Sequence, residues 1–217
     1  MTAHPQPAPR PGGVRPPDRF AGFVAYNARI GGAPDLTGPK AARRLARLNE
    51  LDLIGEHEEW DSFAHMLAKS AQELLGLPET PVAMVNFLTD QEQFFAGLHV
   101  PAPVVPDSVI PAGGQMPRSM PLDYGGCPHV VAEGKALVLD DVCAWRGFWG
   151  NPVVDQLGIR SYLGAPVPDT RTGIILGTVC VIDREVRPWG RPGWGLIKER
   201  AAALAERIHE RERPAPT

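Results

Sequence analysis

Apolar side chains recur every three or four residues in three segments of the chain, as they do on one face of an amphipathic helix. The first segment covers residues 40–54, and its apolar positions, between charged residues, are Leu45, Leu48, Leu51 and Ile54. The second covers residues 60–75 and stops at Gly76 followed by Pro78, a common end for a helix. The third, at residues 196–208, lies near the C-terminus. The pattern predicts two helices before the strands and one after them.

Five shorter segments have the β-branched and apolar composition of strands. Residues 81–90 and 93–98 are separated by a few polar positions, which predicts a hairpin. Residues 136–141 form a third run, and residues 160–167 and 173–183 are joined across a turn. The segment 173–183 is almost wholly apolar, so we expect it at the centre of the sheet.

Two other segments break this pattern between the strands. Residues 99–126 contain six prolines and four glycines without a period, which predicts a long irregular arm across one face of the domain. Residues 151–158 read as a short helix with Asn151 as its cap and Gly158 at its end. The order of elements predicts an α+β fold, in which helices cover one face of an antiparallel sheet and the arm and short helix cover the other.

The composition narrows the classes of partner and compartment. With a net charge of −3, the chain has no excess of positive charge for phosphate backbones, so we expect no nucleic acid partner. No apolar run approaches the roughly 20 residues that cross a bilayer, and the N-terminus lacks the apolar core of an export signal, so we expect a cytoplasmic protein without a membrane partner. Three cysteines in such a chain are expected to be thiols.

Five stretches of sequence, in their order along the chain, resemble the GAF domain family of small-molecule sensory modules, which is related to PAS domains. They are RLARLNELDLIG, VAMVNFLTDQEQFFAGL, MPRSMPLDYGGCPHVVAEGKALVLDDV, GNPVVDQLGIRSYLGAPV and GIILGTVCVIDREVRPW. The domain is expected to span residues 39–212. Residues 1–38, rich in proline and glycine, are expected to form a largely disordered arm, and residues 213–217 a disordered tail.

The resemblance implies a GAF/PAS-like antiparallel sheet with the first and last helices packed on one face. In that family these helices often pair with a second copy, so a homodimer through the terminal helices is expected. A ligand pocket lies on the other face, under a loop and a short helix. The residues expected to border it are Asn86, Phe95, Cys127, His129, Asp141, Trp145, Phe148 and Tyr162.

The cysteines and histidine around position 127 permit several chemistries. Cys127, His129 and Cys143 could supply three zinc ligands, but the paired short spacings of a zinc finger are missing, so no metal is expected. The resemblance implies that a helix begins at Cys127. A thiol there could sense oxidants, or act with Cys143 as in the free methionine sulfoxide reductases that share this fold. The simplest alternative is a small side chain packed below the pocket.

Other cofactors and ligands of the family lack their motifs here. Pro128 follows Cys127 where bilin-binding members have a different pattern, and the residue pairs that hold cyclic nucleotides are incomplete, so the cofactor stays unknown. Asp140 and Asp141 directly follow a strand, which favours turn capping over acid–base catalysis. Trp145, Phe148 and the neighbouring Trp149 could close over a planar ligand or anchor their loop to the core.

The sequence as a whole predicts a cytoplasmic, non-catalytic sensory or regulatory protein that binds a small molecule or a regulatory protein partner. Two alternatives remain. One is a thiol-based redox sensor or reductase-like enzyme that uses Cys127, and the other is a structural adaptor whose pocket is filled by its own side chains.

Overall fold

The computed structural model describes residues 34, 36–101 and 117–212, so most of the expected N-terminal arm, residues 102–116 of the predicted irregular stretch, and the tail lie outside the described residues. The helices are α2 (Gly38–Glu50), α3 (Glu58–Leu75), α4 (Cys127–Glu133), α5 (Pro152–Asp155) and α6 (Gly190–Glu212), and the short 3₁₀ helices are η2 (Val142–Ala144) and η3 (Arg146–Phe148). The strands are β1 (Val82–Leu88), β2 (Glu92–His99), β3 (Ser119–Pro121), β4 (Leu137–Leu139), β5 (Ser161–Pro168) and β6 (Ile175–Asp183).

The six strands form one antiparallel sheet in the order β3-β2-β1-β6-β5-β4. The two predicted hairpins, β1 with β2 and β5 with β6, are confirmed, and β6 is central as its apolar sequence predicts. Gly173 has a φ of 71° in the β5–β6 turn, where glycine is favoured. Strand β3 was not predicted, because its three residues pair only with β2 at the edge of the sheet, inside a proline-rich stretch.

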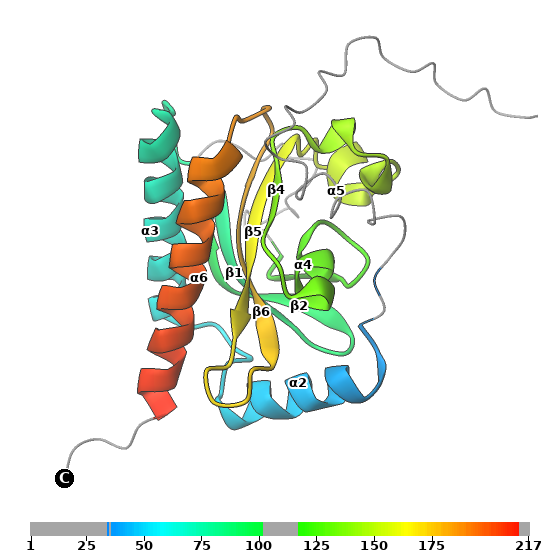
Figure 1. Ribbon diagram of the computed structural model, residues 1–217, viewed down its shortest axis with the longest axis vertical. Helices are drawn as coiled ribbons and strands as arrows, with labels where there is room; N and C mark the ends of the chain where they lie inside the picture. The colour runs from blue at the N-terminus through cyan, green and yellow to red at the C-terminus, as the bar shows by residue number, and fades with distance from the viewer. Residues whose placement is uncertain (1–33, 35, 102–116, 213–217) are drawn as a thin grey trace, which may run out of the picture.

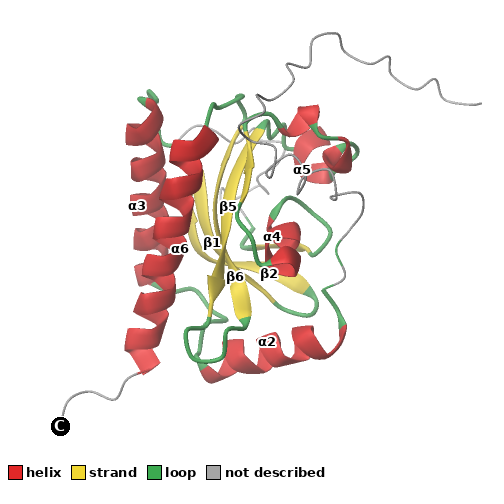
Figure 2. Ribbon diagram, viewed as in Figure 1, coloured by secondary structure: helices red, strands yellow, loops and turns green. Residues whose placement is uncertain are grey.

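Helices α3 and α6 lie side by side along one face of the sheet, while α4 and α5 lie on the other (Figures 1 and 2). Alternation along the strands separates two apolar cores. The core below α3 and α6 includes the buried side chains of Trp60, Leu67, Val179 and Leu204. The opposite core includes those of Met84, Val130, Phe148 and Cys180. This agrees with the expected fold, a sheet covered by helices on one face and by shorter elements on the other.

The structure corrects the prediction for the first helix. It ends at Glu50, so Leu51 is its C-terminal cap and Ile54 lies beyond it, 36% exposed. The buried positions include two arginines, Arg44 and Arg47, which belong to the charged residues between the predicted apolar positions. Helix α2 does not lie beside α6; it runs across one end of the sheet (Figure 1), where the backbone and charged side chains attract the guanidinium groups.

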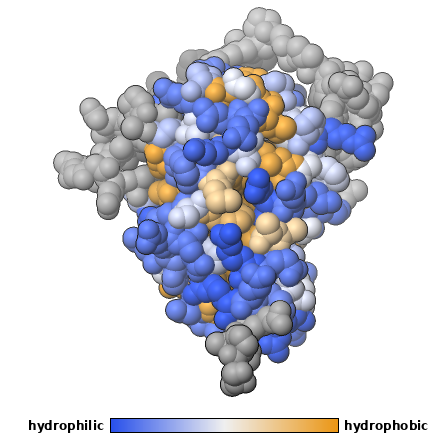
Figure 3. All heavy atoms as spheres, turned by 90° about the vertical axis from the view of Figure 1, so that its left-hand side faces the viewer, coloured by the Kyte–Doolittle hydropathy of each residue, from blue (hydrophilic) through white to orange (hydrophobic). Residues whose placement is uncertain are grey.

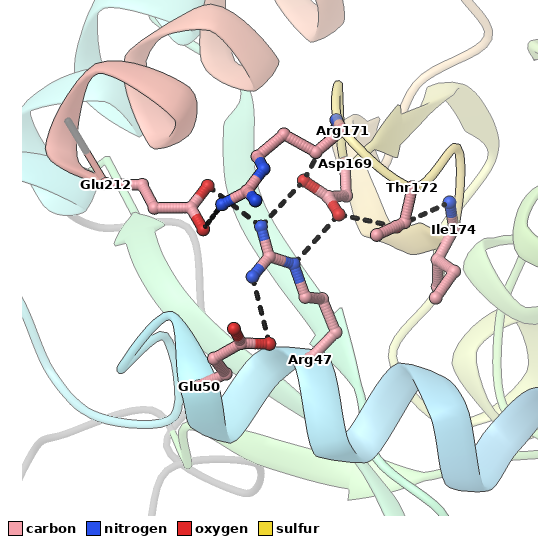
Figure 4. A network of polar contacts seen from close by, with 7 residues as sticks. All are labelled: Arg47, Glu50, Asp169, Arg171, Thr172, Ile174 and Glu212. Atoms are coloured by element: carbon pink, nitrogen blue, oxygen red, sulfur yellow. Dashed lines mark hydrogen bonds and ion pairs between the residues drawn. The ribbon is translucent and has the colours of Figure 1, made fainter.

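Arg47 is the centre of an ion-pair network at this end of the sheet (Figure 4). Its Nε and Nη2 atoms donate to the carboxylate of Asp169, in the β5–β6 turn, over 2.8 and 3.2 Å. Nη2 also donates to Glu212 at the end of α6 over 2.9 Å, and Nη1 lies 3.0 Å from Glu50. The network therefore connects α2, the β5–β6 turn and α6.

Burial and hydrogen bonding act in opposite directions on the Asp169 carboxyl, which is 3% exposed. Burial favours the protonated form, but hydrogen bonds from Arg47, from the Thr172 hydroxyl and from the backbone of Arg171 lower the pKa of Asp169 to about 2. Hydrogen bonds to Asp169 and Glu212 in turn raise the pKa of Arg47. The buried pair is therefore ionised at neutral pH.

Replacing Arg47 should destabilise the protein strongly. Arg47→Met keeps much of the side-chain volume but leaves the carboxylate of Asp169 buried without its cation, so the free energy of unfolding should fall by about 3 kcal/mol. Glu50→Ala removes an exposed partner of the same arginine and should cost less than about 1 kcal/mol. Urea unfolding of the two variants measures both values, and equal effects would contradict the importance given to the buried pair.

Candidate functional site

A cavity of about 40 Å³ lies between the sheet and the elements around α4 and α5. All strands except β4 contribute to its wall, and the other side is formed by α4, η2, η3 and α5. The apolar part of the wall includes Met84, Phe95, Met120, Val142, Phe148, Val153, Val154 and Ile182. Polar groups reach it at few places, chiefly Gln93, Tyr162 and the thiols of Cys127 and Cys180. One water molecule needs a cavity of roughly 10–15 Å³. Unless its wall moves, this cavity therefore holds only a very small molecule.

Two thiols meet in the wall of the cavity. The Sγ atoms of Cys127, the first residue of α4, and Cys180, on the central strand β6, are 3.5 Å apart. The hydroxyl of Tyr162 donates to the Cys127 sulfur over 3.3 Å. The cysteines are 5% and 0% exposed, so the thiols face each other and the cavity.

The hydrogen bond between the thiols makes them unequal. It lowers the pKa of Cys127 against the opposing effect of burial, and the hydrogen bond from the Tyr162 hydroxyl acts in the same direction. The same bond, together with burial, raises the pKa of Cys180. A single negative charge on the pair is therefore placed on Cys127, to which the Tyr162 hydroxyl donates.

The position of Tyr162 depends on two glycines. A Cβ atom at Gly126, the residue before α4, would lie 2.8 Å from the tyrosine ring, and one at Gly164 would lie 2.1 Å from its hydroxyl oxygen. Side chains do not tolerate such distances, so the ring can lie over the strand and reach Cys127 only because both positions lack a side chain.

A second polar group lies at the β1–β2 side of the site. The Asn86 amide donates to Oε1 of Gln93 over 2.9 Å, and the Gln93 amide donates to the carbonyls of Pro121 and Tyr124 over 2.7 and 2.8 Å. These bonds attach the segment before α4 to the sheet. The side-chain oxygen Oδ1 of Asn86 is buried and has no hydrogen-bond partner among the described residues.

The predicted site residues separate into two groups. Phe95, Cys127, Phe148 and Tyr162 line the cavity. The others lie near it without forming its wall. Asn86 is buried in β1, and His129 packs its ring against Phe148, with 5.6 Å between the ring centroids. Trp145 is half-buried against the same apolar core.

Asp141 has a structural position outside the cavity wall. Its carboxylate accepts the backbone N–H of Cys143 and pairs with Arg160 over 3.2 Å. Asp140 accepts the backbone N–H of Gly190 over 3.2 Å. The prediction that these aspartates form caps and backbone hydrogen bonds is confirmed, whereas the role of Asp141 as a residue bordering the pocket stays a prediction.

The pair of Cys127 and Cys143, considered above as one alternative, is not found in the structure. Cys143 is exposed in η2, whereas Cys127 contacts Cys180. Cys180 was overlooked because it lies within an almost continuous apolar strand; pairing of β6 with β1 aligns it with Met84. Within the described segments, no three histidine, cysteine or acidic side chains gather to hold a metal ion, so Cys127, His129 and Cys143 do not form the zinc set considered above.

The three large aromatic side chains at positions 145, 148 and 149 have different environments. Phe148 is 2% exposed and forms part of the cavity wall, while Trp149 is 61% exposed and donates from its indole nitrogen to the carbonyl of Cys143 over 3.1 Å. The loop is anchored to the core through Phe148. Asn151 then caps α5 as predicted, by accepting the backbone N–H of Val153, and it also accepts that of Gly125.

Comparison with known proteins identifies the family to which this domain belongs. The GAF domain model matches residues 59–208, from the start of α3 to near the end of α6. The chain therefore belongs to the GAF domain family, a sensory fold whose members are usually regulatory. Helix α2 lies outside the matched segment.

Individual relatives are distant. The chain is 28% identical over 171 residues to a cyclic di-GMP phosphodiesterase of Pseudomonas aeruginosa, and the match covers 76% of this chain but only 25% of that protein. The GAF domain of an Acinetobacter phosphoenolpyruvate-protein phosphotransferase has a TM-score of 0.50 at 16% identity, covering 80% of this chain and 96% of that one. A free methionine-R-sulfoxide reductase of Neisseria meningitidis has a TM-score of 0.48 at 16% identity, with coverage of 80% and 92%.

No helix in the described part of the chain is both long enough and apolar enough to cross a membrane.

The imidazole of His129 should make the stability of the protein sensitive to acid. Burial lowers the pKa of His129 to about 4 from its ordinary value of 6.5, so the unfolded chain takes up this proton first as the pH falls. The contribution of the neutral His129 imidazole to the free energy of unfolding is complete above pH 6.5. It is lost between pH 6.5 and 4, by about 3 kcal/mol in total.

The test compares unfolding free energies of the parent and of His129→Gln from pH 7.5 to 4. The variant lacks the titrating group, so its curve should be flatter and the gap between the two proteins should close as the pH falls. Parallel curves would show that another group causes the loss.

Proposed function

We propose that this GAF domain is a non-catalytic sensory and regulatory module that binds a small, largely apolar molecule in the cavity beside α4 and α5. The observation that carries the proposal is the cavity itself, an apolar space with polar groups at a few places, as in many small-molecule sites. The cysteine pair and Tyr162 supply those groups on one side, and Gln93 supplies another.

The wall formed by α5 is the part most suited to respond to a ligand. None of the four residues of α5 is buried, so few contacts hold this helix against the sheet. Val153 and Val154 nevertheless line the cavity. A ligand larger than the present space would displace α5 and the loop before it, and a regulatory protein partner could read that displacement.

The regulatory assignment rests on the family and on the cavity. The activity in the name of the phosphodiesterase is not carried over, because this chain spans only a quarter of that protein's length. The net charge of −3 supports a partner other than nucleic acid, and three free thiols support a reducing, cytoplasmic setting.

A structural adaptor is a second candidate, and the small volume of the cavity favours it. The space is about 40 Å³, and the buried side chains of Phe148 and Tyr162 form part of its wall. Such an adaptor would bind a protein through its surface and would not respond to small molecules.

We also propose a homodimer through α3 and α6. Figure 3 looks onto this face of the molecule, and an apolar band is visible between polar side chains. Met66 and Leu74 of α3 are 47% and 37% exposed, and the small side chains of Ala202 and Ala203 are exposed on α6. Two copies could bury these positions in a bundle of four helices.

Filling the cavity should abolish ligand binding without unfolding the protein. Val154→Phe places a ring into the cavity from the α5 side, whereas Val154→Ala enlarges the cavity. Native mass spectrometry of the parent purified from its own cells should show a bound mass that is absent after denaturation. We expect Val154→Phe to lose it and Val154→Ala to keep it. Identical apo masses for all three proteins would favour the adaptor.

A charge on the helical face should break the proposed dimer. Met66→Glu would bury a carboxylate in the interface and should weaken association by about tenfold or more, while Met66→Leu keeps the apolar surface and should leave it unchanged. Sedimentation velocity over a range of concentrations measures this. A parent protein that stays monomeric at every concentration would contradict the proposal.

A further inference from the structure

We propose that Cys127 and Cys180 form a reversible disulfide when hydrogen peroxide enters the cavity. The inference stands apart from the small-molecule function proposed above, because it needs only the two thiols and the space beside them. It is carried by the distance of 3.5 Å between their sulfur atoms, which belong to two elements that the sequence separates by 53 positions.

The surroundings assign different roles to the two thiols. The Tyr162 hydroxyl donates to Cys127 over 3.3 Å, and the contact with the Cys180 thiol at 3.5 Å also favours the thiolate form of Cys127. The thiolate is the nucleophilic form of cysteine, so Cys127 is the attacking thiol. Cys180, which keeps its proton more firmly, is placed to resolve the first product.

The chemistry proceeds in two balanced steps. The Cys127 thiolate attacks one oxygen of hydrogen peroxide, the O–O bond breaks, and a sulfenic acid forms while the departing hydroxide takes a proton to become water. The Cys180 sulfur then attacks the Cys127 sulfur, the S–OH bond breaks, and the thiol proton leaves with that hydroxide as a second water. Two thiols are oxidised by two electrons in total, and one peroxide is reduced to two waters.

The cavity determines which oxidants reach the pair. Both cysteines line a space of about 40 Å³, enough for a molecule with two oxygen atoms and too small for a bulky organic hydroperoxide. Selectivity for hydrogen peroxide over cumene hydroperoxide is therefore expected. The exposed thiol of Cys143 has no such protection.

Oxidation would change the pocket as well as the thiols. A bond between Cys127 and Cys180 joins the first residue of α4 covalently to the central strand. It also removes the thiolate that accepts the Tyr162 hydroxyl. In the oxidised domain, the part of the cavity wall formed by Cys127, Cys180 and Tyr162 would therefore differ from that in the reduced domain.

The test uses the full chain with Cys143→Ser, which removes the exposed thiol. After treatment with hydrogen peroxide, its intact mass should fall by about 2 Da, and dithiothreitol should restore it. Adding Cys180→Ser should stop the reaction at Cys127, with a gain of about 16 or 32 Da and labelling by dimedone. Adding Cys127→Ser should leave Cys180 unreacted over the same time, and Tyr162→Phe should slow the loss of mass. Thermal melting of each variant confirms that it is folded.

Two results would overturn the proposal. One is a folded Cys143→Ser protein that keeps its mass under peroxide while the same protein unfolded in urea loses about 2 Da, since the thiols then do not react within the fold. The other is sulfinic acid accumulating on Cys127 equally fast with and without Cys180, since Cys180 then does not resolve the intermediate. A reaction with cumene hydroperoxide as fast as with hydrogen peroxide would refute the role given to the cavity.

Discussion

The need to compensate the buried charge of Arg47 constrains three separate parts of the chain. A guanidinium group out of contact with water is tolerated only when hydrogen-bond acceptors compensate it, and for Arg47 these are carboxylates from the β5–β6 turn and from the last residue of α6. The central hairpin and the helix that covers it are therefore held at one end by a single side chain. That side chain belongs to α2, outside the segment that matches the GAF family.

The two faces of the sheet bury different kinds of residue. On the side of α3 and α6, large apolar residues such as Trp60 and Trp189 are fully buried and form a continuous core. On the other side the core is interrupted by a cavity, a buried amide pair and two thiols. The apolar core is continuous on one face, and the polar groups of the candidate site lie on the other.

Most of the fold can be predicted from the spacing of apolar residues along the chain. The site cannot, because it depends on contacts between residues that are far apart in the sequence. Five of the six strands and the long helices α3 and α6 were predicted, because apolar alternation and helical spacing are local signals. The burial of Arg44 and Arg47 was not predicted, because charged residues on a helix normally face water. The partner of Cys127 was missed because a cysteine in an apolar strand looks like any small core residue, and only the pairing of β6 brings it opposite α4.

The two glycines around Tyr162 have a consequence for redesign of the pocket. Since Gly126 and Gly164 bring backbone directly against the ring and hydroxyl of the tyrosine, that wall cannot be reshaped by exchanging side chains without displacing the ring itself. The wall around Val153 and Val154 has no such restriction, because its residues present ordinary side chains from a loosely held helix. An engineer who wants to reshape this cavity should therefore vary α5 and leave the tyrosine side untouched.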